Sequence, residues 1–402
     1  MNTKALRSGA LLAMALFWAA AAFCATWIAA GQLRLPGPGA PAPAIAAGPR
    51  AATPEQPRRA RIRAVGDIMV HERQLKAALR PDGSYDFHPQ FARVSDVLSD
   101  ADYTFANLET TIGMQEGKPY SGYPMFNSPE SLLDAVADAG VDFLTLANNH
   151  ILDRRFAGMQ ATVDSVERHG FAHGGANRSP GEKAVPVIVE VNGIRVGVLC
   201  YTEATNGMER GGNGLAREYG VNYLGDADIE ADVRGLRDAG AEVVVALPHW
   251  GLEYRQKPES GTVATARRMV AAGVDVVLGS HPHMVQPVEF VEVETQDGGT
   301  RRGLVAYSLG NFISNQGKRH TESGIVLEFT LAEEEGGGFT VEDVRVLPTF
   351  CWRRDEAIQA LPALQYYDAP PAGMDDATWQ RLRESCDDLR ALMGRDIPLA
   401  AR

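Results

Sequence analysis

Short apolar runs alternate with longer segments of helical periodicity from Arg61 to Ser280. A short apolar run is typical of a buried strand, and apolar residues three or four positions apart are typical of an amphipathic helix. The predicted strands are residues 61–67, 103–109, 141–149, 185–191, 194–201, 242–248 and 274–280. The predicted helices are residues 91–101, 128–140, 155–169, 227–239 and 265–273. This alternation predicts parallel βαβ units with helices on the outer faces.

The pattern changes after Gln286, where strands follow one another without helices between them. The predicted strands here are residues 287–295, 301–312, 323–332 and 339–348, joined by short polar or glycine-rich turns. Such turns connect neighbouring antiparallel strands. We therefore predict one layered, mixed α/β domain over residues 61–348. A C-terminal extension, residues 349–402, contains an amphipathic helix at 374–394 that is expected to pack on the domain.

The N-terminal segment differs from the rest of the chain. Lys4 and Arg7 precede an uncharged stretch, residues 8–33. About 20 apolar residues suffice to cross a bilayer, whereas the apolar region of a cleaved signal has about 7 to 15. Residues 1–34 are therefore predicted to be a signal anchor, a single transmembrane helix that places the domain on the extracytoplasmic side of the cell membrane. Secretion after signal cleavage is the alternative.

Residues 35–60 contain seven prolines and no hydrophobic periodicity. This composition predicts an extended linker between the membrane helix and the folded domain.

The formal net charge of the chain is -12, from 51 acidic and 39 basic residues. An acidic protein is not attracted to nucleic acid or to an anionic membrane surface, so no nucleic-acid partner is expected. An anionic substrate would need a local positive charge, which a bound metal supplies. The four cysteines are too few for a disulfide framework, although Cys351 and Cys386 could pair outside the cytoplasm.

Unusual polar residues stand at the ends of five predicted strands. They are Asp67, Glu109, Asn148, Asn149, His150, His249, His281 and His283. Each alone is readily explained as a turn, a cap or a packed side chain. Together they predict a site at the carboxyl ends of the parallel strands, where the loops of an open α/β sheet converge. Mixed oxygen and nitrogen donors suit one or two divalent metal ions such as Mn, Fe or Zn.

The pair His281 and His283 surrounds a proline in the stretch GSHPHMVQP. In an extended segment, residues i and i+2 project to the same side. We therefore expect both imidazoles to point toward one metal ion.

Six motifs carry a family resemblance: GDIM, NLET, NNHILD, HWGLEY, GSHPHMVQPVE and YSLGNF, which occur in this order between Arg63 and Ser314. In these motifs the chain resembles the capsule-synthesis CapA family, which includes a polyglutamate-capsule synthesis protein and is similar to the calcineurin-like metallophosphoesterases. The resemblance implies a four-layer α/β/β/α sandwich. It also implies the metal ligands Asp67, Glu109, Asn149, His249, His281 and His283.

The resemblance further assigns roles to single residues. Glu109 occupies the place of a bridging Asp. His150 matches a histidine that assists protonation of the leaving group, and Asp153 is expected to orient it. Glu253 and Tyr254 are expected to orient His249.

Two positions depart from the family pattern. The phosphoesterases usually begin with Asp-x-His, but here Met69 stands in place of the histidine, and His71 or Glu72 is a candidate substitute. Arg155 stands where a glycine is usual, and we interpret it as a surface charge. In YSLGNF, Ser308 and Gly310 are expected to shape a turn, with Asn311 within reach of the site.

These features predict a membrane-anchored, metal-dependent hydrolase of capsule or exopolymer biosynthesis, of the polyglutamate type. Its substrate would be a phosphoester or an anionic polymer, and amide hydrolysis by the same site is a further option. The alternative function is a non-catalytic subunit that binds the polymer or supports a capsule synthase and export complex. The missing histidine at Met69 favours the alternative, and the retained His150 favours the enzyme.

Overall fold

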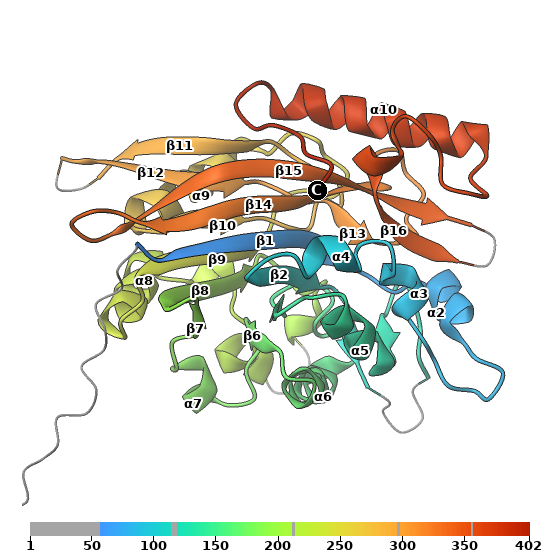
Figure 1. The fold of residues 1–402 in the computed structure, drawn as a ribbon. Coiled ribbons are helices and arrows are strands. Elements are labelled where there is room, and N and C mark those ends of the chain that lie inside the picture. Colours follow the sequence, from blue (N-terminus) through green and yellow to red (C-terminus); the bar gives the residue numbers. More distant parts are fainter. Residues whose placement is uncertain (1–56, 114–118, 211–213, 296–297, 355–356) are drawn as a thin grey trace, which may run out of the picture. The chain divides into compact units, whose positions relative to one another are not determined.

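Two β-sheets packed face to face form the centre of the fold (Figure 1). The computed structural model describes residues 57–113, 119–210, 214–295, 298–354 and 357–402. The eight-stranded sheet has the order β16-β15-β14-β1-β2-β5-β6, with β13 paired to β1. Its strands are β1 (Arg59–Ile68), β2 (Tyr103–Leu108), β5 (Phe143–Thr145), β6 (Ala172–Gly174), β13 (Asn311–Ile313), β14 (Ser323–Glu333), β15 (Phe339–Arg353) and β16 (Ile358–Pro362).

The six-stranded sheet has the order β11-β12-β10-β9-β8-β7. Its strands are β7 (Ile188–Val191), β8 (Ile194–Thr202), β9 (Val243–His249), β10 (Val276–Leu278), β11 (Val288–Glu294) and β12 (Thr300–Ala306). Strands β8, β9, β10 and β12 are parallel, as are β1, β2, β5 and β6 in the other sheet. A short ribbon pairs β3 (Thr111–Ile112) with β4 (Asn127–Ser128).

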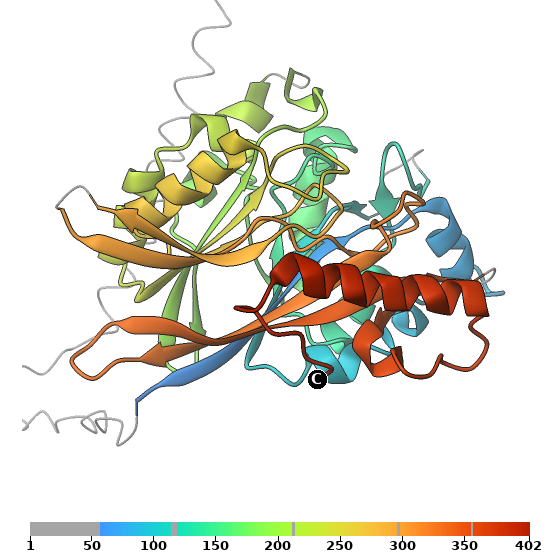
Figure 2. The same ribbon diagram turned by 90° about the horizontal axis from the view of Figure 1, so that it is seen from above.

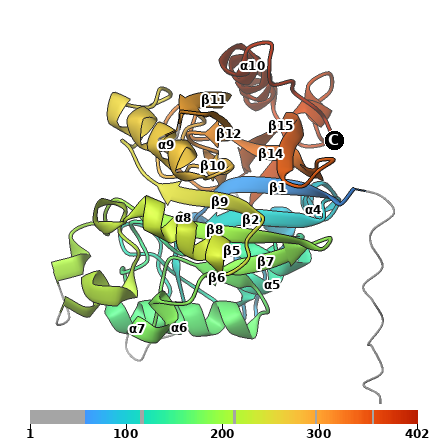
Figure 3. The same ribbon diagram turned by 90° about the vertical axis from the view of Figure 1, so that its left-hand side faces the viewer.

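Helices cover the outer face of each sheet (Figure 3). On the eight-stranded sheet lie α2 (Glu72–Ala78), α3 (His88–Phe91), α4 (Ser95–Leu98), α5 (Ser131–Asp138) and α6 (Arg155–Arg168). On the six-stranded sheet lie α8 (Ile229–Asp238) and α9 (Ser260–Ala272). Further short helices of the described residues are α7 (Pro180–Lys183), η1 (Met208–Arg210), η3 (Ala216–Gly220), η4 (Leu224–Asp226) and η5 (Ala363–Tyr366).

Side-chain alternation along the strands builds these layers. In β1, Ile62 and Ala64 belong to the apolar cluster between the two sheets, whereas Val65 belongs to the cluster beneath the helices. Successive strand residues point to opposite faces of the sheet, so a strand that has a layer on each side carries apolar side chains on both faces. The layers follow the order helix, sheet, sheet, helix, in agreement with the predicted sandwich.

Helix α10 (Asp376–Met393) packs on the domain as predicted (Figure 2). Its Leu382 and Cys386 lie in an apolar cluster with Phe350 and Trp352 of β15. The predicted boundary after residue 348 falls inside β15, which runs through the end of the predicted domain into the extension. Cys351 and Cys386 are both free, buried thiols, so the pairing considered from the sequence is not present.

Two sequence predictions of local structure are wrong. The helix predicted at 91–101 is replaced by the short helices α3 and α4. The strand predicted at 301–312 is two strands in different sheets, because the chain turns at Gly310, whose φ of +69° favours glycine. The strands after Gln286 therefore do not form an antiparallel sheet of their own. They extend both sheets.

The predicted signal anchor, residues 1–34, lies outside the described residues, and so does most of the predicted linker, residues 35–60. Within the described part of the chain, no helix has the length and apolar character needed to span a membrane.

Candidate metal centre

The predicted site residues meet at one end of the two sheets. They are Asp67 in β1, Glu109 after β2, Asn149, His150 and Asp153 after β5, His249 at the end of β9, and His281 and His283 after β10. All except His281 are buried, with exposed fractions of 5% or less. The strand ends thus bring together residues that are far apart in the sequence, as the position of the site in open α/β sheets requires.

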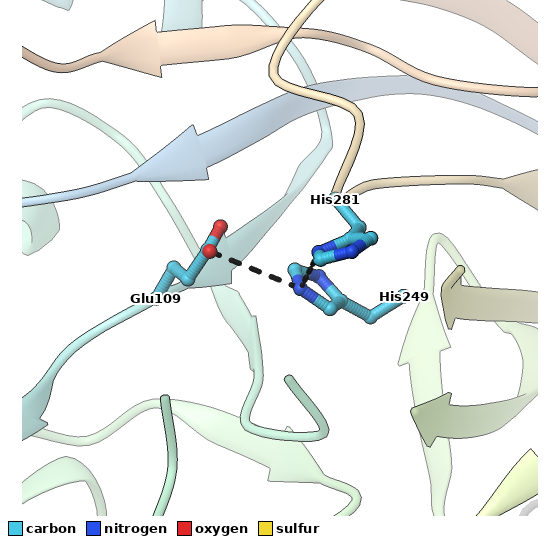
Figure 4. A group of neighbouring side chains, drawn as sticks. All are labelled: Glu109, His249 and His281. Atoms are coloured by element: carbon cyan, nitrogen blue, oxygen red, sulfur yellow. Dashed lines mark hydrogen bonds and ion pairs between the residues drawn. The ribbon is translucent and has the colours of Figure 1, made fainter. Parts of the chain in front are cut away.

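A first ligand group consists of Glu109, His249 and His281 (Figure 4). One donor atom from each lies within 4.8 Å of the other two. The Nε2 of His249 is 3.8 Å from Oε1 of Glu109 and 3.0 Å from Nδ1 of His281. Oδ1 of Asn149 approaches the same Nε2 at 3.1 Å. Donor atoms at these separations suit a common ion with bonds of about 2.0 to 2.3 Å.

A second ligand group consists of Asp67, Glu109 and His283. The Nδ1 of His283 is 3.0 Å from Oδ2 of Asp67, and its Nε2 is 3.8 Å from Oε1 of Glu109. Glu109 therefore belongs to both groups, and the same oxygen faces a histidine in each. This is the position that a bridging carboxylate would need.

Glu109 is the residue whose surroundings fit a cation best. It is fully buried, and its Oε1 makes no hydrogen bond to any described residue. Burial raises the pKa of Glu109 well above its ordinary value, and the nearby carboxylate of Asp67 raises it further. A buried carboxylate oxygen without a donor costs free energy. Divalent metal ions between the two groups would remove this cost, so the residues present fit such ions.

The histidines of the first group are neutral at pH 7. The pKa of His249 lies well below its ordinary value and that of His281 is lowered to about 4, mainly because of burial and in part because of the neighbouring histidines. A metal ion binds the neutral imidazole. The pocket therefore presents two histidine lone pairs without prior loss of a proton.

The lowered pKa of His281 predicts how the stability of the metal-free protein responds to pH. The side chain titrates near 6.5 in the unfolded chain and at about 4 in the folded protein. Between these values the unfolded state binds a proton that the folded state does not, so the contribution of His281 to stability is lost as pH falls. We expect the free energy of unfolding, measured with a chelator present, to fall less steeply over this window in His281→Ala than in wild type. Equal slopes would contradict the lowered pKa.

The backbone at His281 and His283 differs from the prediction. Their φ angles are +99° and +58°, so neither residue is extended. The ring centroids are 6.0 Å apart, and the two side chains join different ligand groups rather than aiming at one ion. Residues other than glycine seldom adopt this conformation, which costs of order 1–3 kcal/mol and is concentrated at functional sites.

Polar residues that the sequence analysis did not assign to the site orient the ligands. Asn107 donates from Nδ2 to Oδ1 of Asp67 at 2.8 Å. Ser280 pairs through Oγ with Nδ1 of His249 at 2.9 Å. Such partners fix the ring orientation of a metal-bound histidine. The sequence could have indicated Asn107, because it stands two residues before Glu109 in the predicted strand 103–109, and residues at this spacing face the same side of a strand.

The residues expected to orient His249 do not do so. The ring nitrogens of His249 contact other groups, and Tyr254 lies instead beside His283, with ring centroids 5.9 Å apart. Glu253 is exposed.

His150 and Asp153 form a buried pair beside the ligand groups. Nδ1 of His150 is 2.7 Å from Oδ2 of Asp153, and the same oxygen accepts a hydrogen bond from the Phe126 amide at 2.7 Å. The rings of Phe126 and His150 also form a T-shaped contact, with centroids 4.6 Å apart. Burial raises the pKa of Asp153, and the hydrogen bond with His150 opposes this effect. Asp153 holds Nδ1 of His150 in a hydrogen bond, which leaves Nε2 of the same ring to exchange a proton.

The missing histidine has no replacement among its neighbours in sequence. Met69 is buried, and its sulfur accepts a hydrogen bond from Ser314 Oγ at 3.8 Å. His71 accepts a hydrogen bond at Nδ1 from the Asn315 amide at 3.3 Å, and Glu72 is exposed on α2. Neither His71 nor Glu72 joins a ligand group in the part of the chain that the structure describes.

Arg155 has a φ of +62° and an exposed side chain, as expected for a surface charge. The positive φ explains why glycine is favoured at this position.

A cavity of about 430 Å³ opens beside the first ligand group. It is lined by Asn149, His249 and His281, and also by Glu253 and Arg255, whose side chains are exposed. Within the described residues, the Arg255 guanidinium has no hydrogen-bond or ion-pair partner. Another cavity, of about 350 Å³ near Lys183, is lined by none of the predicted site residues.

Known proteins resemble this chain over its central region. It is 28% identical over 275 residues to Capsule biosynthesis protein CapA of Bacillus anthracis. The matched region covers 67% of this chain and 63% of that protein. It is 26% identical over 286 residues to PGA biosynthesis protein CapA of Bacillus subtilis (strain 168), and this matched region covers 70% of each of the two chains. The match thus spans somewhat less than two thirds of the length of the first relative.

Among solved structures, the calcineurin-like phosphoesterase YfkN from Bacillus subtilis is 14% identical, with a TM-score of 0.41. The similarity covers 83% of this chain and 98% of that one.

The six motifs lie within the region recognised by a family model. Residues 61–316 match the family described as Bacterial capsule synthesis protein PGA_cap. This match covers more than half of the chain and confirms the resemblance seen in the motifs. The chain belongs to the bacterial capsule synthesis protein PGA_cap family.

Proposed function

We propose that this protein is a metal-dependent hydrolase that acts outside the cytoplasm in the synthesis of a polyglutamate-type capsule or exopolymer. One observation carries the proposal. Two ligand groups share the buried carboxylate of Glu109, whose Oε1 has no hydrogen bond among the described residues, and a buried His150–Asp153 pair stands beside them. A purely structural metal site needs ligands but no proton donor, so the His150–Asp153 pair favours a catalytic role for the site.

Each ligand group would hold one ion. Glu109, Asn149, His249 and His281 would hold one ion, and Asp67, Glu109 and His283 the other. Divalent ions bound there would supply Lewis-acid polarisation of the substrate and activation of a water molecule. Ser280 and Asn107 keep the ligands oriented before an ion binds, because each is hydrogen-bonded to one of them.

The chain's own residues would perform the remaining steps. His150 would hold a proton at Nε2 and give it to the leaving group, while Asp153 fixes the ring through Nδ1. The cavity beside His249 would admit the substrate, and the free guanidinium of Arg255 would attract its negative charge. The substrate is a phosphoester, or an amide of an anionic polymer.

The N-terminal residues extend the proposal to location. Residues 1–34 would anchor the chain in the cell membrane, with the domain on the extracytoplasmic side, unless the segment is cleaved and the domain secreted. Membrane proteins that synthesise or export the polymer would then be its partners.

A second candidate function is a non-catalytic, polymer-binding or scaffold subunit of the same assembly. The observation in its favour is Met69, because a buried thioether occupies the place of a ligand usual in the phosphoesterases.

Metal analysis tests the proposal directly. We expect the purified protein to bind one or two equivalents of Mn, Fe or Zn and to hydrolyse a chromogenic phosphoester or a γ-glutamyl oligomer. A His281→Ala/His283→Ala double variant should lose both properties. His169→Ala/His173→Ala is the matched control, since it removes two partly buried histidines outside the ligand groups. Metal without hydrolysis of either substrate would favour the second function, and no metal would refute the first.

A further inference from the structure

The second ligand group lacks a donor that the first one has. The first group has a fourth donor atom in Asn149 Oδ1, whereas among the described residues the second group has Asp67, Glu109 and His283. The side chain of Met69 does not fill the gap, because its sulfur faces Ser314. The surroundings of His283 contain one further buried oxygen that could.

That oxygen is Oδ1 of Asn311, which lies 3.1 Å from Nδ1 of His283. The same nitrogen is 3.0 Å from Oδ2 of Asp67. Asn311 is completely buried, so its amide must find its partners inside the protein. The oxygen of Asn311 thus lies beside the same His283 nitrogen as the carboxylate of Asp67, whereas Glu109 faces the other nitrogen of that ring.

The orientation of the Asn311 amide is fixed. Its Nδ2 donates to the main-chain oxygen of Thr321 at 2.9 Å and to Oε1 of Gln316 at 3.0 Å. A main-chain carbonyl can only accept, so a flipped amide would set two oxygens against each other. The hydrogen-bond network therefore directs Oδ1 toward His283.

The backbone explains why Asn311 reaches the site. Strand β13 pairs with β1, and Asn311 stands opposite Asp67 in the register. The two chains approach so closely that a Cβ at Gly66 would lie 1.8 Å from the Gly310 oxygen. Glycine at position 66 permits this approach, and the turn at Gly310 directs Asn311 into β13.

We propose that Asn311 supplies the fourth donor of the second ligand group, in the place left by the histidine that is absent at Met69. The proposal rests on the metal-binding part of the proposed function. It gives the second group three oxygen donors and one nitrogen, against two nitrogens and two oxygens in the first. Oxygen-rich sites suit Mn²⁺, and imidazole suits Zn²⁺. The two positions therefore differ in preference, with Mn²⁺ favoured beside Asn311.

Titration of the metal-free, full-length protein with Mn²⁺, followed by the electron paramagnetic resonance signal of the free ion, tests this assignment. In Asn311→Ala we expect the Mn²⁺ dissociation constant to rise at least about 10-fold, while one equivalent of Zn²⁺ still binds. Retained Zn²⁺ also reports that the variant is folded.

Two further variants separate a ligand from a residue that only shapes the turn. Asn311→Asp keeps an oxygen toward the site, but its carboxylate cannot donate a hydrogen bond to Thr321. If Asn311 is a ligand, this variant should retain Mn²⁺ binding. If Asn311 only shapes the turn, the variant should lose Mn²⁺ binding as Asn311→Ala does. Gln316→Ala removes a partner of Nδ2 and should bind Mn²⁺ as wild type does.

Unchanged Mn²⁺ binding in Asn311→Ala would overturn this assignment and leave the proposed hydrolase intact. Equal losses in Asn311→Ala and Gln316→Ala would also overturn it. Wild-type protein that binds neither Mn²⁺ nor Zn²⁺ would overturn both proposals.

Discussion

Replacing Glu109 with Gln should abolish tight binding at both metal positions and, with it, hydrolysis. The carboxylate is shared by the two ligand groups, so a single neutral amide weakens both. Loss of one outer-shell partner already costs about 10- to 100-fold in metal affinity. We therefore expect the dissociation constants to rise by more than about 100-fold, measured by titration of the chelator-treated protein.

The same substitution should not weaken the metal-free fold. Glu109 is buried with an oxygen that no described residue satisfies, and its pKa is raised by burial and by Asp67. A neutral side chain of the same size removes the like-charge repulsion. With a chelator present, the melting temperature of Glu109→Gln should equal or exceed that of wild type.

Glu322→Gln is a suitable control for Glu109→Gln. Glu322 is also buried, it has an oxygen without a hydrogen bond among the described residues, and it belongs to neither ligand group. This control should retain both metal ions. If Glu109→Gln also retained both, Glu109 would not be a shared ligand.

Replacing His150 with Ala should separate catalysis from metal binding. His150 belongs to neither ligand group of the described residues, so the metal content should stay at the wild-type value. Its loss should lower turnover by about 10²- to 10⁴-fold, which is the usual contribution of a general acid. The loss should be smaller for a substrate whose leaving group needs no proton, such as an activated nitrophenyl ester.

His71→Ala is the matched control for His150→Ala. Both rings pack edge-on against Phe126, with centroids 5.1 Å away for His71 and 4.6 Å for His150. His71 is paired with a main-chain amide rather than with a carboxylate. We expect less than a 10-fold loss in this variant. A loss of metal in His150→Ala, or a loss in turnover equal to that of His71→Ala, would contradict the role of His150 as proton donor.

The sequence indicated where the site lies because each site residue follows an apolar run that is readable locally. The positions of His249 and Glu109 could be predicted from the end of a single strand in each case. The family motifs then added the expected pairing of His150 with Asp153, which the structure contains. Local signals of this kind do not depend on which strands become neighbours.

Other features of the site were not predictable because they depend on contacts between distant segments. Asn311 was expected within reach of the site, but its position opposite Asp67 depends on the turn at Gly310, which moves the chain from one sheet to the other. Likewise, the left-handed backbone of His281 and His283 follows from their surroundings, since the residue type does not favour it. A sequence pattern gives the face of a strand but not its partner.

The candidate centre takes its ligands from both sheets. Asp67 and Glu109 extend from strands of the eight-stranded sheet, and His249 and His281 from strands of the six-stranded sheet. Ions bound by both sets would cross-link two layers that also adhere through apolar side chains. An ion that binds only the folded chain stabilises it by about 2.7 kcal/mol at 100 times its dissociation constant. The supply of metal would then set the stability of the folded domain as well as the occupancy of the site.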